Sequence, residues 1–182
     1  MRPAHAGATI ATALAVAFRV IAGVAAPVAG TWAQAPSGHA AYRPEREESA
    51  ALRKINAYRE KRGREPLAMS LALGAAAEHH SADMARRDYF AHDAPGGPSW
   101  DGNIRDHGYT GSPIGENIAA GMESAGAVVQ AWKRSPGHRR TMLDGSFRAV
   151  GIGRSYDGRS GYGWYWTADF GGEVEREVSC RR

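Results

Sequence analysis

The chain is poor in cysteine, in net charge and in long apolar segments, and each shortage limits what the protein can be. Cys180 is the only cysteine, so no disulfide can form within the chain and its fold must be held by a hydrophobic core. Lys and Arg number 23 against 19 Asp and Glu, which gives a formal net charge of +4. Because no basic face interleaved with aromatic residues accompanies this small excess, we expect no nucleic-acid partner.

The first 35 residues have the pattern of an export signal. Arg2 gives a positive start, small and apolar residues dominate positions 7–29, and Ala33-Gln34-Ala35 forms a small-residue cleavage site. We therefore expect residues 1–35 to be a signal peptide cleaved near Ala35, and the protein to be secreted to the extracellular space or the periplasm. The uninterrupted apolar stretch 20–30 is too short to cross a bilayer, so we expect a mature monomer without a stable membrane span.

The mature chain reads as a flexible leader over 36–45, one domain over 46–173 and a polar tail over 174–182. Apolar periodicity and capping residues predict helices over 46–62, 70–88, 99–107 and 124–135, and a further helix restarting at Ser135-Pro136. Alternation of apolar residues predicts strands over 115–121, 149–155 and 162–170, the last two joined by a turn at Asp157-Gly158. Helices first and an antiparallel hairpin last predict an α+β domain with helices covering a small sheet.

Three short motifs supply two imidazoles and one carboxylate: Tyr89-Phe90-Ala91-His92, Gly115-Glu116-Asn117 and Pro136-Gly137-His138-Arg139. Two neutral histidines and a glutamate make most of a divalent-metal site, with water or a ligand at the remaining position. His138 falls in the first turn of a predicted helix, where exposed N–H groups and the helix dipole disfavour a positive charge. We therefore expect a lowered pKa that keeps His138 neutral near pH 7, as a metal ligand must be.

Each of these residues also has a structural interpretation. His92 can hold its Pro/Gly-rich loop through a hydrogen bond, and His138 can be a surface histidine at the start of a helix. Glu116, at the start of a strand, needs a partner, which can be a metal, a histidine or backbone N–H groups. His80 lies on the apolar stripe of its predicted helix, which favours a satisfied core histidine. Ser135 is better explained as a helix cap than as a nucleophile.

Taken in order, the motifs resemble a bacterial CAP domain, the SCP-like relatives of cysteine-rich secretory, antigen 5 and pathogenesis-related 1 proteins. The resemblance covers residues 46–172 and is carried by seven segments: Leu52-x-x-Ile55-Asn56-x-x-Arg59, His80-Ser81-x-Asp83-Met84, Tyr89-Phe90-x-His92, Gly115-Glu116-Asn117-Ile118-Ala119, Trp132-x-x-Ser135-Pro136-Gly137-His138-Arg139, Val150-Gly151-Ile152-Gly153 and Trp166-x-x-x-Phe170-Gly171. It implies a three-layer α-β-α sandwich with a small central antiparallel sheet.

The resemblance also implies a surface cleft lined by two histidines and two glutamates, which binds divalent cations in some members. His92, Glu116 and His138 match the first histidine, the first glutamate and the second histidine. Ser135 stands where the second glutamate falls. We therefore expect a site of three ligands, His92, Glu116 and His138, that binds Zn²⁺ or another divalent cation weakly.

Two functions from different classes fit this set of residues. The first is a secreted binding module whose cleft holds a divalent cation, a small or lipid-like ligand, or a cell-surface component, without turnover. The second is a peptidase-like hydrolase that uses a water bound at the same cleft. The chain has no H-E-x-x-H motif, no G-x-S-x-G motif and no assignable second carboxylate, so no catalytic residue can be named and we rank the binding module first. A hydrogen-bonded cluster without metal is a third interpretation.

Overall fold

The computed structural model describes residues 44–174, where five helices pack on a four-stranded sheet. The helices are α1 (Arg46–Glu60), α2 (Leu71–Arg87), α3 (Trp100–Asp106), α4 (Ala125–Arg134) and α5 (Pro136–Leu143). The strands are β1 (Ala68–Met69), β2 (Ile114–Ala120), β3 (Ala149–Tyr156) and β4 (Trp164–Gly171). The predicted signal peptide, the leader up to residue 43, and Cys180 with the tail from 175 lie outside the described residues.

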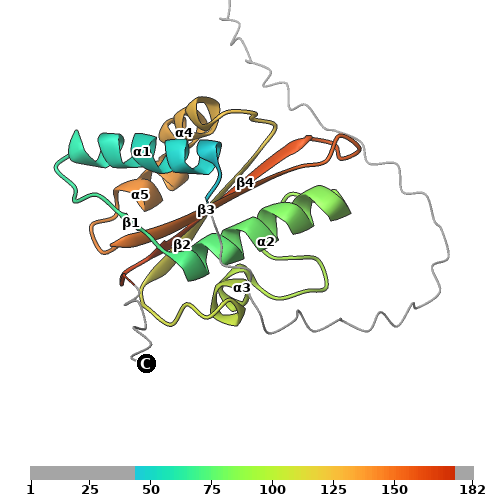
Figure 1. Cartoon of the computed structure of the whole chain (residues 1–182), viewed down its shortest axis with the longest axis horizontal. Helices are drawn as coiled ribbons and strands as arrows, with labels where there is room; N and C mark the ends of the chain where they lie inside the picture. The colour runs from blue at the N-terminus through green and yellow to red at the C-terminus, as the bar shows by residue number, and fades with distance from the viewer. Residues whose placement is uncertain (1–43, 175–182) are drawn as a thin grey trace, which may run out of the picture. The chain divides into compact units, whose positions relative to one another are not determined.

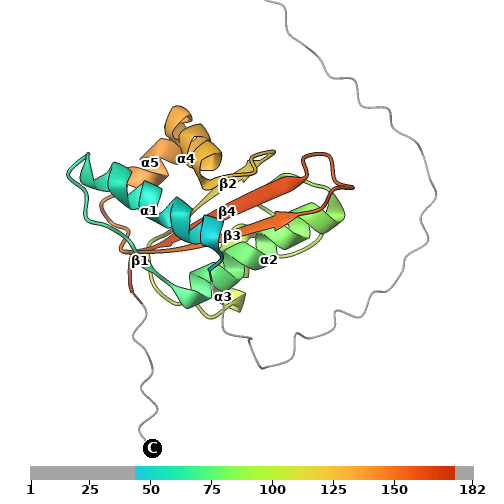
Figure 2. The same cartoon turned by 45° about the horizontal axis from the view of Figure 1, so that its top comes forward.

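The predicted α+β class is confirmed, and Figures 1 and 2 show its three layers. Helices α1, α4 and α5 cover one face of the sheet, and α2 with α3 covers the other. The strand order is β1-β3-β4-β2, with β4 antiparallel to both β3 and β2. The sheet is mixed because β1 runs parallel to β3. Strand β1 has two residues, too few for an alternating pattern, and was not predicted. None of the helices in residues 44–174 has the length and apolar character needed to cross a membrane.

The main hydrophobic core lies between the sheet and helices α1, α4 and α5. Trp132 is fully buried in this core, and its indole N–H donates to the carbonyl of Ile118 at 3.2 Å. Strand β4 contributes Trp166, Ala168 and Phe170 to the same cluster. The residues that alternate with these three along β4 therefore point to the opposite face of the sheet, toward α2.

Helix α2 rests directly on β3 because two glycines face it. Val150 and Ile152 point into the main core, so the alternate residues Gly151 and Gly153 face the other side. A Cβ atom at either glycine would overlap backbone atoms of α2. This backbone-to-backbone approach fixes α2 over the sheet, and α2 carries His80 toward β2.

Arg59 is a charged residue of α1 that does not face water. It is fully buried, and its guanidinium donates to four carbonyl oxygens. These belong to Glu65 at 2.8 Å, Met142 at 2.7 Å, Asp144 at 3.0 Å and Phe147 at 3.4 Å. Arg59 therefore ties α1 to the segment that leaves α5 and enters β3.

Candidate functional site

The centre of the site is a hydrogen bond between a buried carboxylate and a half-exposed imidazole. Glu116 leaves β2 on the face covered by α2, and its side chain is 2% exposed. Its Oε1 accepts a hydrogen bond from Nδ1 of His92 at 2.5 Å, and the His92 side chain is 49% exposed. This charge-assisted contact raises the pKa of His92, because the proton on the imidazole is held by the carboxylate. The pair thus connects the interior of the domain to solvent.

His80 approaches the same carboxylate from α2. Its Nε2 donates to the carbonyl of Ala91 at 3.1 Å and lies 3.9 Å from Oε2 of Glu116. The prediction of a satisfied core histidine is confirmed, since His80 is 3% exposed and hydrogen-bonded. Burial lowers the pKa of His80 and outweighs the attraction of Glu116, so this imidazole is neutral near pH 7.

A second carboxylate, Asp169, lies directly behind Glu116. The two residues face each other in the register of β2 and β4, so their side chains share the face under α2. Asp169 is fully buried, and neither of its oxygens meets the geometry of a hydrogen bond within residues 44–174; the same holds for Oε2 of Glu116. Burial first, and then the negative charge of Glu116, raises the pKa of Asp169 well above its usual range.

His138 stands at the start of α5 and is half-buried. Its carbonyl accepts a hydrogen bond from Nδ2 of Asn117 at 3.0 Å, which ties α5 to the strand that carries Glu116. Its pKa is lowered, as predicted, and the causes are burial and then the positive charge of His92. Ser135 occupies the N-cap position of α5 as predicted, although its side chain makes no capping hydrogen bond.

The structure therefore joins two of the three predicted site residues directly, His92 and Glu116, and places His138 within electrostatic range of His92. Within residues 44–174 no three His, Cys, Asp or Glu side chains are arranged to hold a metal ion. A hollow of about 10 Å³ lies beside His92, between α2 and α3. It has room for about one water molecule, so a larger ligand must approach His92 from the solvent side.

Residues 52–170 match the family described as "CAP: Cysteine-rich secretory protein family". The chain belongs to this family. The resemblance seen in the sequence motifs is thus confirmed, and the protein carries a CAP domain.

Two relatives come from Bacillus subtilis strain 168. The CAP-domain chain is 34% identical over 143 residues to the uncharacterized protein YkwD, which covers 79% of this chain and 52% of YkwD. It is 29% identical over 106 residues to the uncharacterized membrane protein YlbC, covering 58% of this chain and 31% of YlbC. The chain thus spans about half the length of the first relative and about a third of the second.

Solved structures share the fold. An extracellular protein containing a SCP domain from Bacillus anthracis aligns with a TM-score of 0.61 at 28% identity, covering 69% of this chain and 41% of that one. An outer surface protein from Borrelia burgdorferi aligns with a TM-score of 0.62 at 19% identity, covering 69% of this chain and 91% of that one. The second likeness shows the fold alone.

Two members of the site, His80 and Asp169, were missed by sequence reasoning. The apolar stripe of α2 predicted that His80 lies in the core. It could not predict that His80 lies beside Glu116, because Glu116 belongs to a strand that is distant in sequence. Asp169 sits between Ala168 and Phe170 in a strand that was predicted to be buried on one face. An acid inside such a strand is a signal in itself, since an ionised carboxyl rarely enters a core without a partner.

Proposed function

We propose that this CAP domain is an exported binding protein that holds a ligand at His92 and Glu116 without chemical turnover. The observation that carries the proposal is the 2.5 Å hydrogen bond between the half-exposed His92 and the buried Glu116. The carboxylate orients the ring through Nδ1, which leaves Nε2 to contact a ligand. An imidazole held in this way needs little rearrangement to bind, and that favours recognition.

The surroundings favour a ligand with both a polar and an apolar part. The raised pKa of His92 favours the protonated ring, whose Nε2–H donates to an oxygen of the ligand. Phe90, two residues earlier, is 44% exposed, and its ring lies 5.8 Å from that of Tyr162, which is 56% exposed. Two exposed aromatic rings, one of them two residues from the polar anchor in sequence, suit a small lipid-like molecule or an amphiphilic cell-surface component.

A divalent cation is the second ligand we propose for the site, with His92, Glu116 and His138 as the residues that would hold it. Their donor chemistry fits Zn²⁺, which would add a positive charge able to polarise a bound oxygen. The side chains as they stand in residues 44–174 do not form a three-ligand site. A bound cation therefore requires these side chains to move, and we expect an affinity in the micromolar range or weaker.

The cation proposal is tested by calorimetric titration of the purified protein with Zn²⁺. We expect weak saturable binding that is lost in His92→Ala and in His138→Ala. His79→Ala, which removes an exposed histidine of α2 outside the trio, should bind as the wild type does. Equal affinity in all four proteins would refute a shared site. Ser135→Glu supplies the fourth family ligand, a second carboxylate, without removing a capping bond, so it should tighten binding by about tenfold.

Asp169 gives the hydrolase alternative a specific basis, since it supplies the second carboxylate that the sequence did not reveal. Its complete burial behind Glu116 keeps it from a substrate at the surface, so we still rank binding first. Hydrolysis of casein by the protein, measured with and without a chelator, distinguishes the two functions. Hydrolysis that is sensitive to the chelator and abolished by Glu116→Gln would overturn the ranking.

Export is supported by the signal-like residues 1–35 and by the B. anthracis relative, which is described as extracellular. N-terminal sequencing of the protein recovered from culture medium or periplasm tests it. We expect a mature chain that begins near Pro36. Recovery of only the full-length chain, inside the cell, would contradict the proposal.

A further inference from the structure

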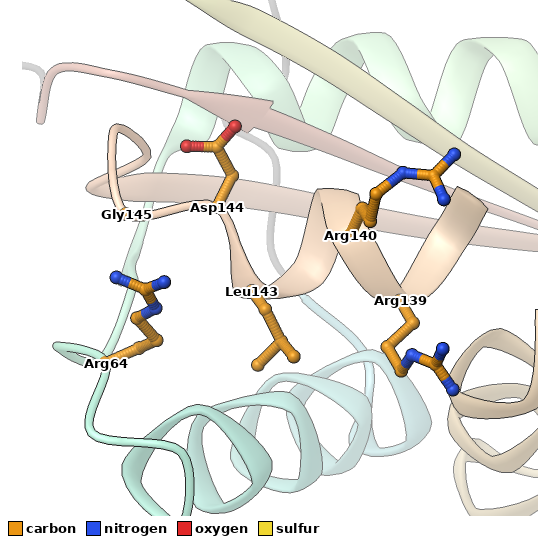
Figure 3. Close-up of a pocket in the computed structure, with 6 residues that line it drawn as sticks. All are labelled: Arg64, Arg139, Arg140, Leu143, Asp144 and Gly145. Atoms are coloured by element: carbon orange, nitrogen blue, oxygen red, sulfur yellow. The ribbon is translucent and has the colours of Figure 1, made fainter. Parts of the chain in front are cut away.

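A pocket of about 380 Å³ lies between α5 and the segment that follows α1 (Figure 3), and neither His92 nor Glu116 lines it. It is lined by Arg64, Arg139, Arg140, Leu143, Asp144 and Gly145. In Figure 3, Arg64 reaches toward the loop of Asp144 and Gly145, while Arg139 and Arg140 leave α5 in different directions. The volume is near the lower end of the roughly 300–1,000 Å³ typical of small-molecule sites.

The three arginines of this pocket are free to bind. All are exposed, and within residues 44–174 none of their guanidinium groups makes a hydrogen bond or an ion pair. Asp144 is the one acid in the lining, and its Oδ1 accepts from the N–H of Ser146 at 2.8 Å and from its hydroxyl at 2.6 Å. These two bonds lower the pKa of Asp144 and hold its carboxylate in the turn. The lining therefore keeps an excess of positive charge.

The backbone beneath the pocket strengthens this excess. Carbonyl oxygens repel an anion, but those of Met142, Asp144 and Phe147 accept hydrogen bonds from the buried Arg59. Arg148 likewise donates to the carbonyl of Gly145 at 2.5 Å. Two further guanidinium groups, those of Arg59 and Arg148, thus satisfy carbonyl oxygens of the segment that supplies Asp144 and Gly145 to the lining.

We propose that this pocket binds a phosphate group carried on a small molecule or on a lipid headgroup. Guanidinium groups present paired N–H donors that match phosphate oxygens, and they bind phosphate more specifically than a point charge does. The space around the arginines exceeds that of a bare phosphate, which points to a phosphate ester. The site is separate from His92 and Glu116, so its occupancy does not depend on the function proposed above.

Calorimetric titration at low ionic strength with inorganic phosphate and with glycerol 3-phosphate tests the proposal. We expect saturable binding, tighter for the ester. Arg64→Gln and Arg140→Gln should each weaken it at least fivefold, and the double variant should weaken it further. The affinity of Arg64→Lys should lie between those of the wild type and Arg64→Gln, because lysine keeps the positive charge and lacks the paired N–H donors. Arg159→Gln removes the same charge from the distant β3–β4 turn, where Arg159 pairs with Asp157, and should change nothing.

Sedimentation with vesicles separates the two sources of phosphate. Binding to phosphatidylglycerol vesicles but not to phosphatidylcholine vesicles, reduced in the Arg64→Gln/Arg140→Gln variant, assigns the site to a lipid headgroup. Binding to glycerol 3-phosphate alone assigns it to a soluble ester. Absence of binding to every phosphate probe would overturn the proposal, and so would an equal loss in Arg159→Gln. Zn²⁺ titration of the double variant should match the wild type, which keeps this result distinct from that for the His92 site.

Discussion

Replacing Asp169 with asparagine should stabilise the protein at neutral pH. Both oxygens of Asp169, and Oε2 of Glu116 opposite, are buried without a hydrogen bond in the described part of the chain. An asparagine amide can donate to Oε2 and is neutral at every pH, whereas the buried aspartate must take up a proton to become neutral. Avoiding that cost of protonation should raise the free energy of unfolding of Asp169→Asn above that of the wild type by up to about 4 kcal/mol at pH 7.

The dependence on pH gives the sharper test. The pKa of Asp169 is raised in the folded state, so the folded protein keeps a proton that the unfolded chain releases. Above the ordinary pKa of aspartate, the wild type therefore loses stability relative to Asp169→Asn by about 1.4 kcal/mol per pH unit, until the folded pKa is passed. Below that ordinary pKa, protonated aspartate and asparagine are nearly equivalent and the difference closes.

Denaturant unfolding, followed by tryptophan fluorescence at pH 4, 5.5 and 7, measures both effects. Asp157→Asn is the control, because the pKa of Asp157 is lowered by its contact with Arg159, and its loss should have a small effect of opposite sign. A stability difference for Asp169→Asn that does not change with pH would show that Asp169 is ionised in the folded protein. Our account of the paired carboxylates would then be wrong.

Three other predictions concern His92 and the residues that hold the helices around the site. Arg59→Met leaves two buried carbonyl oxygens without their donor and should destabilise the protein by about 2–5 kcal/mol in the same unfolding assay; a cost below about 1 kcal/mol would mean that water replaces the guanidinium. Gly153→Ala places a methyl group on the backbone of α2 and should cost about 3 kcal/mol, whereas Gly126→Ala, which meets no close contact in α4, should be neutral or slightly stabilising. By NMR titration, His92 should retain its proton to a higher pH than a free histidine does, and Glu116→Gln should shift the pKa of His92 back downward. The stability that the His92–Glu116 contact contributes is full below the ordinary pKa of histidine and is lost as the pH rises through the pKa of His92 in the folded protein.

Local sequence signals were sufficient for most of the fold. Serines at 70, 99 and 124 cap α2, α3 and α4 as predicted, because capping depends on residues within one turn. The position of α5 followed from proline at its first residue for the same reason. Strand β1 was missed because its pairing with β3 is set by the fold and not by its own two residues.

The site was only partly predictable because its members meet through tertiary contacts. The motifs led to His92, Glu116 and His138 as one site, and the structure joins the first two by a hydrogen bond. The register that sets Asp169 opposite Glu116 belongs to the pairing of β2 with β4, which no local pattern encodes. The burial of Arg59 was missed for a similar reason, since its four acceptors come from segments that approach α1 only in the folded chain.

The two glycines under α2 have a consequence for how the site can change. Most binding sites can be adjusted by exchanging side chains between the layers of a fold, which shifts one layer against another in small steps. Here the layers touch through backbone atoms at Gly151 and Gly153, so no smaller residue is available and any larger one lifts the helix. The spacing between His80 on the helix and Glu116 on the sheet is therefore fixed by the chain itself. Under the function proposed above, changes in ligand preference should therefore arise in the loop that carries His92 and at the start of α5.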